Sequence, residues 1–283
     1  MPETPPVVLT IAGFDPSSGA GVTADIKTIA AHDCYGVACI TALTVQSTRG
    51  VRRVFPVAPE VVRETLEELA GDFQLAAVHI GMLGSGILVH AVADFLADRK
   101  LANVVLDPVL RASSGADLLD GLGIRLLAEK LFPLATVITP NVDEAAALTG
   151  LEVSNLEQMR AAAARLRGMD AAAVVVTGGH LDPAVDLLSV RAAGGVEEDA
   201  EEKVFQSDRL RSNSTHGTGC AFSTALACNL ANGQSLGEAV SRAKAYVADA
   251  IKAAYLLGRG TGPVNHLYNW RNRIVRSDPE NAV

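Results

Sequence analysis

Short runs rich in Val and Ile alternate with longer helix-like segments, and this alternation constrains the fold more than any other feature. The run VVLTIA precedes AGVTADIKTIAAH, AAVHI precedes ILVHAVADFLADR, and NVVLD precedes GIRLLAEKLF. Strands that alternate with helices form βαβ units and build a mainly parallel, doubly wound sheet. No repeat or low-complexity linker divides the chain, so we predict a single α/β domain over residues 1–283, with a core at 7–270 and a tail at 271–283.

The alternation stops near residues 186–206, where two strand-like runs flank a Gly-Gly pair and an acidic segment. This pattern predicts a β-hairpin insertion, with the charged stretch EEDAEE at 197–202 as its solvated tip. In open α/β sheets, ligands bind outside the carboxyl ends of the strands. We therefore expect a functional site in the loops that follow the strands.

Composition narrows the possible partners. Hydrophobic residues make up 49% of the chain but aromatic residues only 4%, so the core must consist of Ala, Val, Leu and Ile, as suits a buried parallel sheet. The net charge of −8 argues against a nucleic-acid or membrane partner, because phosphates attract basic proteins.

The spacing of the cysteines and the N-terminal residues indicate the cellular compartment of the protein. The four cysteines form no C-x-x-C pair, so a zinc site or a disulfide framework is not expected. The start MPETPP lacks the features of a signal peptide. These observations predict reduced thiols and a cytoplasmic protein. The cysteines are Cys34, Cys39, Cys220 and Cys228.

The stretch Leu75–Ala93 contains no formally charged residue and is long enough to span a bilayer. Three glycines interrupt it, so it is better interpreted as a buried strand, a loop and a helix. The sequence therefore predicts no membrane span here.

The segment NSTHGTGCAFSTALA, residues 213–227, combines two glycines with a small, helix-prone run. The first N–H groups of a helix have no partner within it and carry partial positive charge, so an anion binds there if no side chain blocks it. Gly217, Thr218 and Gly219 fit such a site. Taken alone, the same pattern also fits a glycine loop that merely begins a buried helix.

Two common phosphate-binding devices fit poorly. GAGVTA, Gly19–Ala24, matches a dinucleotide fingerprint, but the preceding strand ends near Ala12, and CITALTVQ, about twenty residues on, contains no acid to hold a ribose. No lysine in the chain follows a glycine, which excludes a Walker A loop. Phosphate binding must use another arrangement.

Seven segments occur in an order that resembles a known family: TIAGFDPSSGAGVTADIKT, ITALTVQSTRGV, IGML, LDPVL with SSG and LL, TPNVDEAAAL, VVVTGGH and STHGTGCAFSTALA. Together they resemble the hydroxymethylpyrimidine/phosphomethylpyrimidine kinases of thiamine biosynthesis, in the ribokinase-like superfamily. The resemblance implies a three-layer α/β/α sandwich. It also implies ATP-dependent phosphorylation of 4-amino-5-hydroxymethyl-2-methylpyrimidine to the monophosphate and then the diphosphate, by a protein that is commonly a homodimer.

The resemblance assigns catalytic roles near residue 217. It implies that Gly217, Thr218 and Gly219 form an anion hole around the transferred γ-phosphoryl group. Cys220 matches the position of an aspartate base in sugar-kinase relatives. A helix N-terminus lowers a thiol pKa and burial raises it, so the sequence leaves the ionisation of Cys220 open. We hypothesise that a neutral thiol avoids repelling the substrate phosphate in the second step.

Four residues are expected to bind the substrate. The amide of Gln46 offers one acceptor and two donors, the complement of an aminopyrimidine edge, and the sequence predicts that it follows a strand. The resemblance places Asp25 near the ring and hydroxymethyl group, and gives Gly13 and Met82 backbone and apolar contacts to the ring. From the residues alone, Asp25 could be a solvated helix residue and Met82 an ordinary core residue.

Three residues are expected to bind ATP phosphates or a metal ion. Asn141 and Glu144 form an N-x-x-E pattern, which by itself predicts an N-cap and a favourable first-turn charge. The resemblance assigns this pair to Mg²⁺ and its water, with Asp107, after VVLD, as the other acid. Because Mg²⁺ takes few protein ligands, contact through water is reasonable.

Thr177 is expected to lie near ATP, although it and Ser114 stand where many family members have lysine. The loss of two cations should weaken ATP binding or shift the burden to Mg²⁺ and nearby hydroxyl groups. Two alternatives stay open. One is a pyridoxal or pyridoxine kinase of vitamin B6 salvage, because related kinases phosphorylate the hydroxymethyl group of a similar flat ring; the other, to which Thr177 leaves some room, is a non-catalytic pyrimidine-binding sensor.

Overall fold

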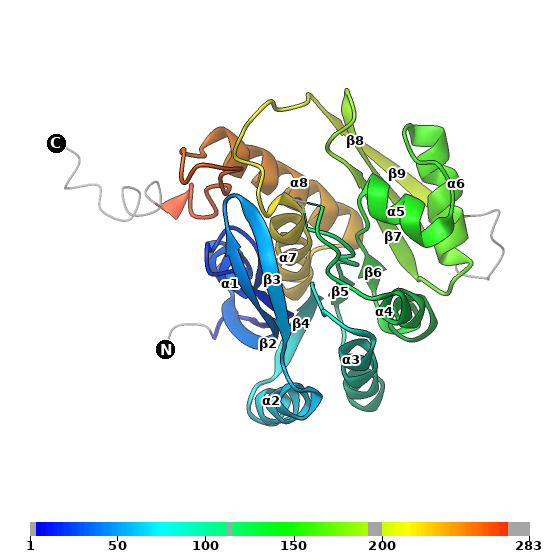
Figure 1. Ribbon diagram of the computed structural model, residues 1–283. Coiled ribbons are helices and arrows are strands. Elements are labelled where there is room, and N and C mark those ends of the chain that lie inside the picture. The colour runs from blue at the N-terminus through cyan, green and yellow to red at the C-terminus, as the bar shows by residue number, and fades with distance from the viewer. Residues whose placement is uncertain (1–3, 113–114, 192–199, 271–283) are drawn as a thin grey trace.

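One sheet forms the middle layer of the molecule (Figure 1). The computed structural model describes residues 4–112, 115–191 and 200–270, and within these ranges nine strands lie in the order β3-β2-β1-β4-β5-β6-β7-β8-β9. Pairing is parallel from β2 to β7 and antiparallel at both edges. The strands are β1 Val7–Phe14, β2 Tyr35–Ser47, β3 Gly50–Pro56, β4 Leu75–Ile80, β5 Val104–Leu106, β6 Val137–Ile138, β7 Ala173–Gly178, β8 Ala184–Val190 and β9 Glu201–Ser207.

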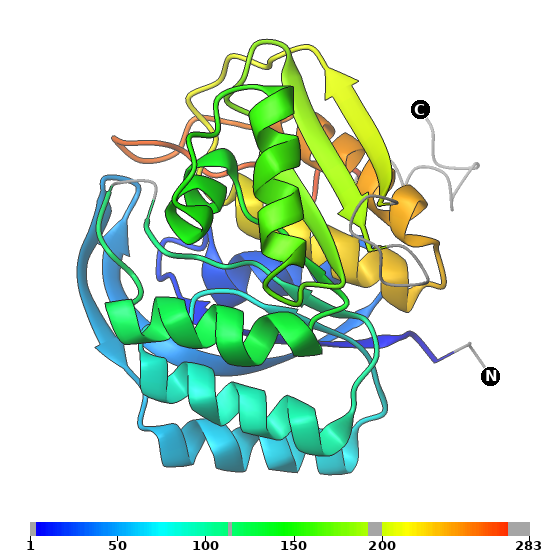
Figure 2. The ribbon, with the colours of Figure 1, turned by 90° about the vertical axis from the view of Figure 1, so that its right-hand side faces the viewer.

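Helices cover both faces of this sheet (Figures 1 and 2). α1, α7 and α8 pack on one face, and α2 to α6 pack on the other. The structure thus confirms the predicted three-layer α/β/α sandwich. The helices are α1 Gly21–Ala31, α2 Pro59–Asp72, α3 Gly86–Arg99, α4 Gly121–Leu126, α5 Val142–Thr149, α6 Leu156–Arg167, α7 Thr218–Ala231 and α8 Leu236–Lys252, with the short η1 Leu127–Leu131 and η2 Phe132–Leu134 after α4.

Alternate residues of the central strands enter two separate cores. Leu9 and Ile11 of β1 join the core beneath α2 to α6, whereas Val8 joins the core beneath α1, α7 and α8. In β5, Leu106 faces the first core and Val105 the second. Strands buried on both faces must be apolar at every position, which explains the continuous Val and Ile runs of the sequence.

An edge hairpin was not predicted. The sequence predicted a strand at GVACITA followed directly by the helix at PEVVRETLEELAG, but β2 continues to Ser47 and the chain turns back as β3. Arg52 and Arg53 interrupt the apolar pattern because β3 is an edge strand with exposed side chains. Gln46 consequently lies inside β2 rather than after a strand.

The antiparallel pair β8 and β9 occupies the region where the sequence predicts a hairpin. The pairing extends from Ala184 with Ser207 to Val190 with Glu201, slightly beyond the predicted limits. Of the predicted tip at 197–202, residues 197–199 lie outside the described residues, and Glu201 and Glu202 belong to β9.

The uncharged stretch at residues 75–93 forms β4, a loop and the first part of α3. This arrangement is the one expected from its glycines. Within the described ranges, no helix is both long and apolar enough to cross a bilayer.

Candidate active site

A cavity of about 760 Å³ opens at the carboxyl ends of the parallel strands. The chain runs from β1 to β2 in one direction and from β4 to β7 in the other, so the strand order reverses between β1 and β4. Such a switch point is where open α/β sheets bind ligands. The wall includes the ends of β1 and β7, the loops after β4, β5 and β6, and the first turn of α7.

The first turn of α7 lines this cavity with Gly217, Thr218, Gly219 and Cys220. Gly217, the N-cap residue, has φ of 80°, and a Cβ there would lie 1.9 Å from the carbonyl oxygen of Gly19. Only glycine therefore fits this position. Since glycine has no side chain, it leaves the first-turn N–H groups uncapped, as an anion site requires.

Cys220 is a half-buried thiol at this helix start. Burial raises its pKa well above the ordinary value, and the charges of Asp107 and Asp25 raise it further, while the backbone of Gly21 lowers it less. The thiol is therefore neutral near pH 7. The structure thus decides between the two opposing effects that the sequence left open.

Two carboxyl groups, Asp107 and Glu144, face the same cavity. Burial raises the pKa of Asp107 to about 6, partly offset by His79 and by Ser223, whose Oγ lies 3.1 Å from Asp107 Oδ2. Burial and the Asp107 charge raise the pKa of Glu144 to about 8. The Asp107 charge thus disfavours ionisation of Glu144, and a divalent cation bound between the two acids would relieve this repulsion.

Asn141 and Glu144 cap the start of α5. Asn141 Oδ1 accepts a hydrogen bond from the Glu144 N–H at 2.9 Å, and Glu144 Oε2 accepts one from the Asn141 N–H at 3.0 Å. This capping box confirms the N-cap that the sequence predicts. Thr177, at the end of β7, donates its N–H to Pro140 O at 2.9 Å and lines the cavity beside Asn141. Ser114 lies outside the described residues.

Gln46, Gly13 and Met82 lie on the opposite side of the cavity wall from Thr177, on β2, on β1 and after β4. A Cβ on Gly13 would lie 2.9 Å from Met82 Sδ, so glycine allows the thioether to approach β1. The structure thus brings together three of the four residues that were expected to bind substrate.

Asp25 does not lie on the cavity wall. Its side chain is fully buried, where it accepts hydrogen bonds from Thr10 Oγ1 at 2.7 Å and Thr224 Oγ1 at 2.9 Å and lies 3.4 Å from His79 Nδ1. The substrate-binding role that the resemblance implies for Asp25 stays a prediction, because this carboxylate is not among the groups that line the cavity. Its position on the inner face of α1 turns the carboxylate toward α7 and β4 instead.

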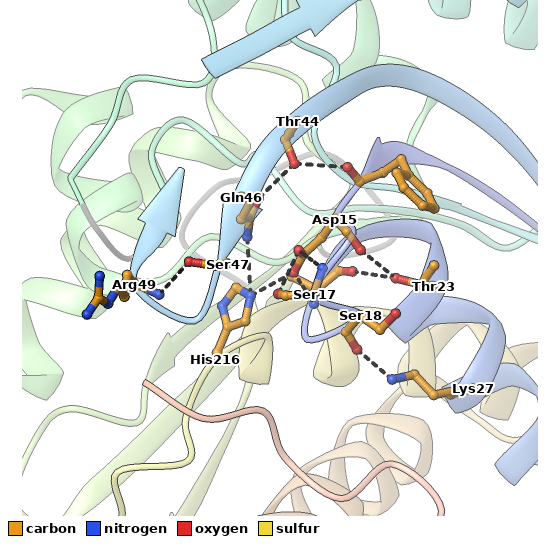
Figure 3. A network of polar contacts seen from close by, with 12 residues as sticks. Asp15, Ser17, Ser18, Thr23, Lys27, Thr44, Gln46, Ser47, Arg49 and His216 are labelled. Carbon is orange, nitrogen blue, oxygen red and sulfur yellow. Dashed lines mark hydrogen bonds and ion pairs between the residues drawn. The ribbon is translucent and has the colours of Figure 1, made fainter. Parts of the chain in front are cut away.

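Asp15 and His216 line the cavity (Figure 3), although neither residue was among the candidates selected from the sequence. His216 Nε2 lies 2.8 Å from Asp15 Oδ2 and 3.3 Å from the amide of Gln46. Asp15 lies in GFDPSSGAG and His216 lies in STHGTGC, two segments that carry the family resemblance. Their presence in these segments could have marked them as candidates. Their 201-residue separation hid the contact.

A second ion pair that sequence reasoning missed lies at the β7–β8 end of the cavity. Lys244 Nζ lies 2.7 Å from Asp186 Oδ2, and Asp186 Oδ1 accepts the Gly178 N–H at 3.0 Å. Lys244 thus supplies a cation near Thr177, although from α8 rather than from β7. Among the described residues, no cluster of three or more His, Cys, Asp and Glu side chains could hold a metal ion.

Comparisons with known proteins identify the family of this chain. The family model for phosphomethylpyrimidine kinase matches residues 15–265. The hydroxymethylpyrimidine/phosphomethylpyrimidine kinase of Haemophilus influenzae is 42% identical over 92% of this chain and 96% of its own. The thiamine biosynthesis bifunctional protein ThiED of Geobacter sulfurreducens is 44% identical over 92% of this chain, which spans 52% of that longer protein.

Solved structures extend the comparison. The crystal structure of an ADP complex of Bacillus subtilis pyridoxal kinase has a TM-score of 0.84 and 34% identity, covering 94% of this chain and 98% of that one. The fold is therefore ribokinase-like. The family model spans most of the sequence and the relatives match nearly all of it, so this chain belongs to the phosphomethylpyrimidine kinase family of phosphotransferases.

Proposed function

We propose that this chain transfers the γ-phosphoryl group of ATP to 4-amino-5-hydroxymethyl-2-methylpyrimidine and then phosphorylates the monophosphate to the diphosphate. One relative is named a thiamine biosynthesis protein, and another is named a hydroxymethylpyrimidine/phosphomethylpyrimidine kinase. The single observation that carries the proposal is one cavity with the Gln46 amide on one wall and the uncapped start of α7 at its base. The amide complements an aminopyrimidine, and the helix start complements a phosphoryl group.

Phosphoryl transfer depends mainly on alignment and on stabilising negative charge. In this proposal, the N–H groups of Gly217, Gly219 and Cys220 hold the phosphoryl oxygens, while the N–H of Thr218 already donates to Thr215 O. Gln46 and Met82 orient the ring. The neutral thiol of Cys220 adds no negative charge beside the substrate phosphate in the second step. Asn141 and Thr177 contact the ATP phosphates at the other end of the cavity.

Asp107 and Glu144 would hold Mg²⁺, with water molecules between at least one carboxylate and the ion. The raised pKa values of both acids support this role, because a bound divalent cation would stabilise their ionised forms. When bound, Mg²⁺ would neutralise charge on the transferring phosphates. Its preference for several water ligands suits a site with few protein ligands.

A second candidate is phosphorylation of pyridoxal, favoured by the similarity to a pyridoxal kinase over nearly the whole chain. ³¹P NMR of the purified protein with Mg-ATP separates the candidates when hydroxymethylpyrimidine and pyridoxal are supplied in parallel tubes. A monophosphate followed by a diphosphate in the first tube supports the proposal. Phosphate ester in the pyridoxal tube alone would move the assignment to vitamin B6, and no product in either tube would favour a pyrimidine-binding sensor.

The family resemblance also leads us to propose a homodimer that works in the cytoplasm, without a nucleic-acid or membrane partner. Light scattering after gel filtration tests the homodimer, because the dimer has twice the 29.4 kDa of one chain. A single peak at the mass of one chain would contradict it.

A further inference from the structure

Asp15 joins three segments that meet beside the cavity (Figure 3). Its Oδ1 accepts hydrogen bonds from the backbone N–H of Ser17 at 2.8 Å and the Ser17 hydroxyl at 2.7 Å. Its Oδ2 lies 3.0 Å from the N–H of Ala20 and 2.8 Å from His216 Nε2. Burial raises the pKa of Asp15, but the hydrogen bonds from His216 and Ser17 outweigh it and hold the pKa below its ordinary value. Asp15 is therefore an ionised acceptor.

This carboxylate fixes the proton on the imidazole of His216. An ionised carboxylate only accepts hydrogen bonds, so His216 Nε2 must carry a hydrogen and donate it to Asp15. The pair is secluded, with the Asp15 side chain 4% exposed and that of His216 15% exposed. A neighbouring polar atom is therefore more stable near this N–H if it is a hydrogen-bond acceptor than if it is a donor.

The other polar atom close to His216 Nε2 belongs to the side-chain amide of Gln46. As drawn in Figure 3, the amide nitrogen faces His216 Nε2 at 3.3 Å and the oxygen faces Thr44 Oγ1 at 3.0 Å. That orientation directs N–H groups of Gln46 and His216 at each other. It also divides the single hydroxyl hydrogen of Thr44 between Gln46 and the carbonyl oxygen of Phe14, 2.9 Å away.

A half turn of the amide removes the contact between N–H groups and the competition at Thr44. The Gln46 oxygen then faces the single His216 N–H, which is donated mainly to Asp15 Oδ2 at 2.8 Å, while the Gln46 nitrogen donates to Thr44 Oγ1 and Thr44 donates to Phe14. Oxygen and nitrogen of a glutamine amide are assigned from their partners, and here both partners demand the same orientation.

The orientation of this amide decides how a 4-aminopyrimidine can lie. The ring presents an acceptor at N3 and a donor at the 4-amino group, so the amino group must face the Gln46 oxygen, on the His216 side. The hydroxymethyl group is on C5, next to C4, and therefore extends farther in the same direction. His216 is followed directly by Gly217, where the uncapped helix start begins. The reversed amide would turn the hydroxymethyl group toward Thr44 instead.

We propose that Asp15 and His216 are positioning residues that orient the Gln46 amide and so select a 4-amino over a 4-oxo pyrimidine. This inference rests on the proposed function. A 4-oxo pyrimidine presents the reverse pattern, a donor at N3 and an acceptor at C4, and in the productive position it needs the amide orientation that the His216 N–H disfavours.

The test compares kcat/KM for hydroxymethylpyrimidine and for its 4-oxo analogue in the wild-type protein and in Asp15→Asn. An asparagine side chain offers a donor as well as an acceptor to His216 Nε2, so it no longer requires a hydrogen on that nitrogen, and the Gln46 amide can turn. We expect the 4-amino to 4-oxo ratio to fall at least tenfold, about 1.4 kcal/mol of discrimination. An unchanged ratio in an active Asp15→Asn protein overturns the proposal.

The control is Thr23→Val, because Thr23 Oγ1 lies 3.1 Å from the backbone oxygen of Asp15 and holds the same loop. It should slow both substrates equally and leave the ratio unchanged. If Asp15→Asn does not fold, His216→Phe removes the same N–H and should also lower the ratio. A wild-type protein that phosphorylates neither pyrimidine refutes the proposed function instead, and that result is distinct from an unchanged ratio.

The imidazole offers a readout that does not depend on turnover. Long-range ¹H–¹⁵N spectra of the wild-type protein should show His216 protonated at Nε2, with the signal assigned by its absence in His216→Phe. Asp15→Asn should shift the Nε2 resonance toward that of an unprotonated nitrogen. An unprotonated Nε2 in the wild-type protein would contradict the inference.

Discussion

Asn141 and Glu144 satisfy each other's backbone N–H groups at the start of α5, at 2.9 and 3.0 Å, and both side chains line the cavity. The capping box thus fixes the position of a carboxylate as well as the end of a helix. Stability and activity should therefore respond to the same substitution.

Asn141→Ala should cost about 1 kcal/mol of stability, because the cap is lost, and should lower kcat/KM at least tenfold, because Glu144 is no longer held. The control is Ser235→Ala, in the capping box that Ser235 and Glu238 form at α8, away from the cavity. Denaturant unfolding should show a similar loss for both, and only Asn141→Ala should lose activity. Full activity in Asn141→Ala would contradict the prediction.

Cys220→Asp should slow the second phosphorylation at least tenfold more than the first. A carboxylate about 4 Å from the substrate phosphate repels it by several kcal/mol at an effective dielectric constant near 20, whereas the neutral thiol does not. Single-turnover rates with the alcohol and with its monophosphate measure both steps. Cys220→Ser, which is neutral, should slow both equally, and equal slowing in Cys220→Asp would refute the charge argument.

The stability of the ligand-free protein should fall as pH rises from 5 to 8. The pKa of Glu144 is about 8 in the folded protein, against about 4.3 in an unfolded chain, and Asp107 shifts in the same direction. Between these values the folded state binds more protons than the unfolded state, so the free energy of unfolding declines with pH.

Glu144→Gln should flatten this decline, and Mg²⁺ should raise the melting temperature of the wild type at pH 8 more than that of the variant. Thermal melts across the pH range provide the measurement. Glu157→Gln, at an exposed first-turn glutamate of α6, should retain the wild-type slope. If the stability of Glu144→Gln still falls with rising pH as steeply as that of the wild type, titratable groups other than Glu144 cause the fall.

Asp25→Asn should destabilise the protein by about 3 kcal/mol or more, because it leaves the buried His79 without its partner charge. Burial lowers the pKa of His79, but Asp25 and Asp107 raise it above its ordinary value. The stability supplied by this pair is complete below about pH 6.5 and is lost as pH rises through the folded pKa.

Denaturant unfolding compares Asp25→Asn with Asp94→Asn, which breaks the exposed pair of His90 and Asp94 and should cost at most about 1 kcal/mol. An Asp25→Asn protein with wild-type stability but a raised KM for the pyrimidine would instead support direct contact with the substrate.

The edge of the sheet shows where local pattern stops being informative. β1, β4 and β7 are buried on both faces, so their sequences are mainly apolar and identify them as strands. β3 is exposed and contains Arg52 and Arg53, so its sequence resembles a loop. Its pairing with β2 depends on tertiary structure and cannot be recognised from a short stretch of the sequence.

The sequence by itself determined the doubly wound fold, the glycine-led start of α7, the cap at Asn141 and the place of Asp107 at a strand end, because backbone requirements and hydrophobic periodicity are local. Only the tertiary structure decided that Asp25 faces the protein interior, that Cys220 is neutral and that His216 contacts Asp15. Burial and charge at each of these groups come from segments distant in the chain, and the dielectric environment of a side chain depends on what folds around it.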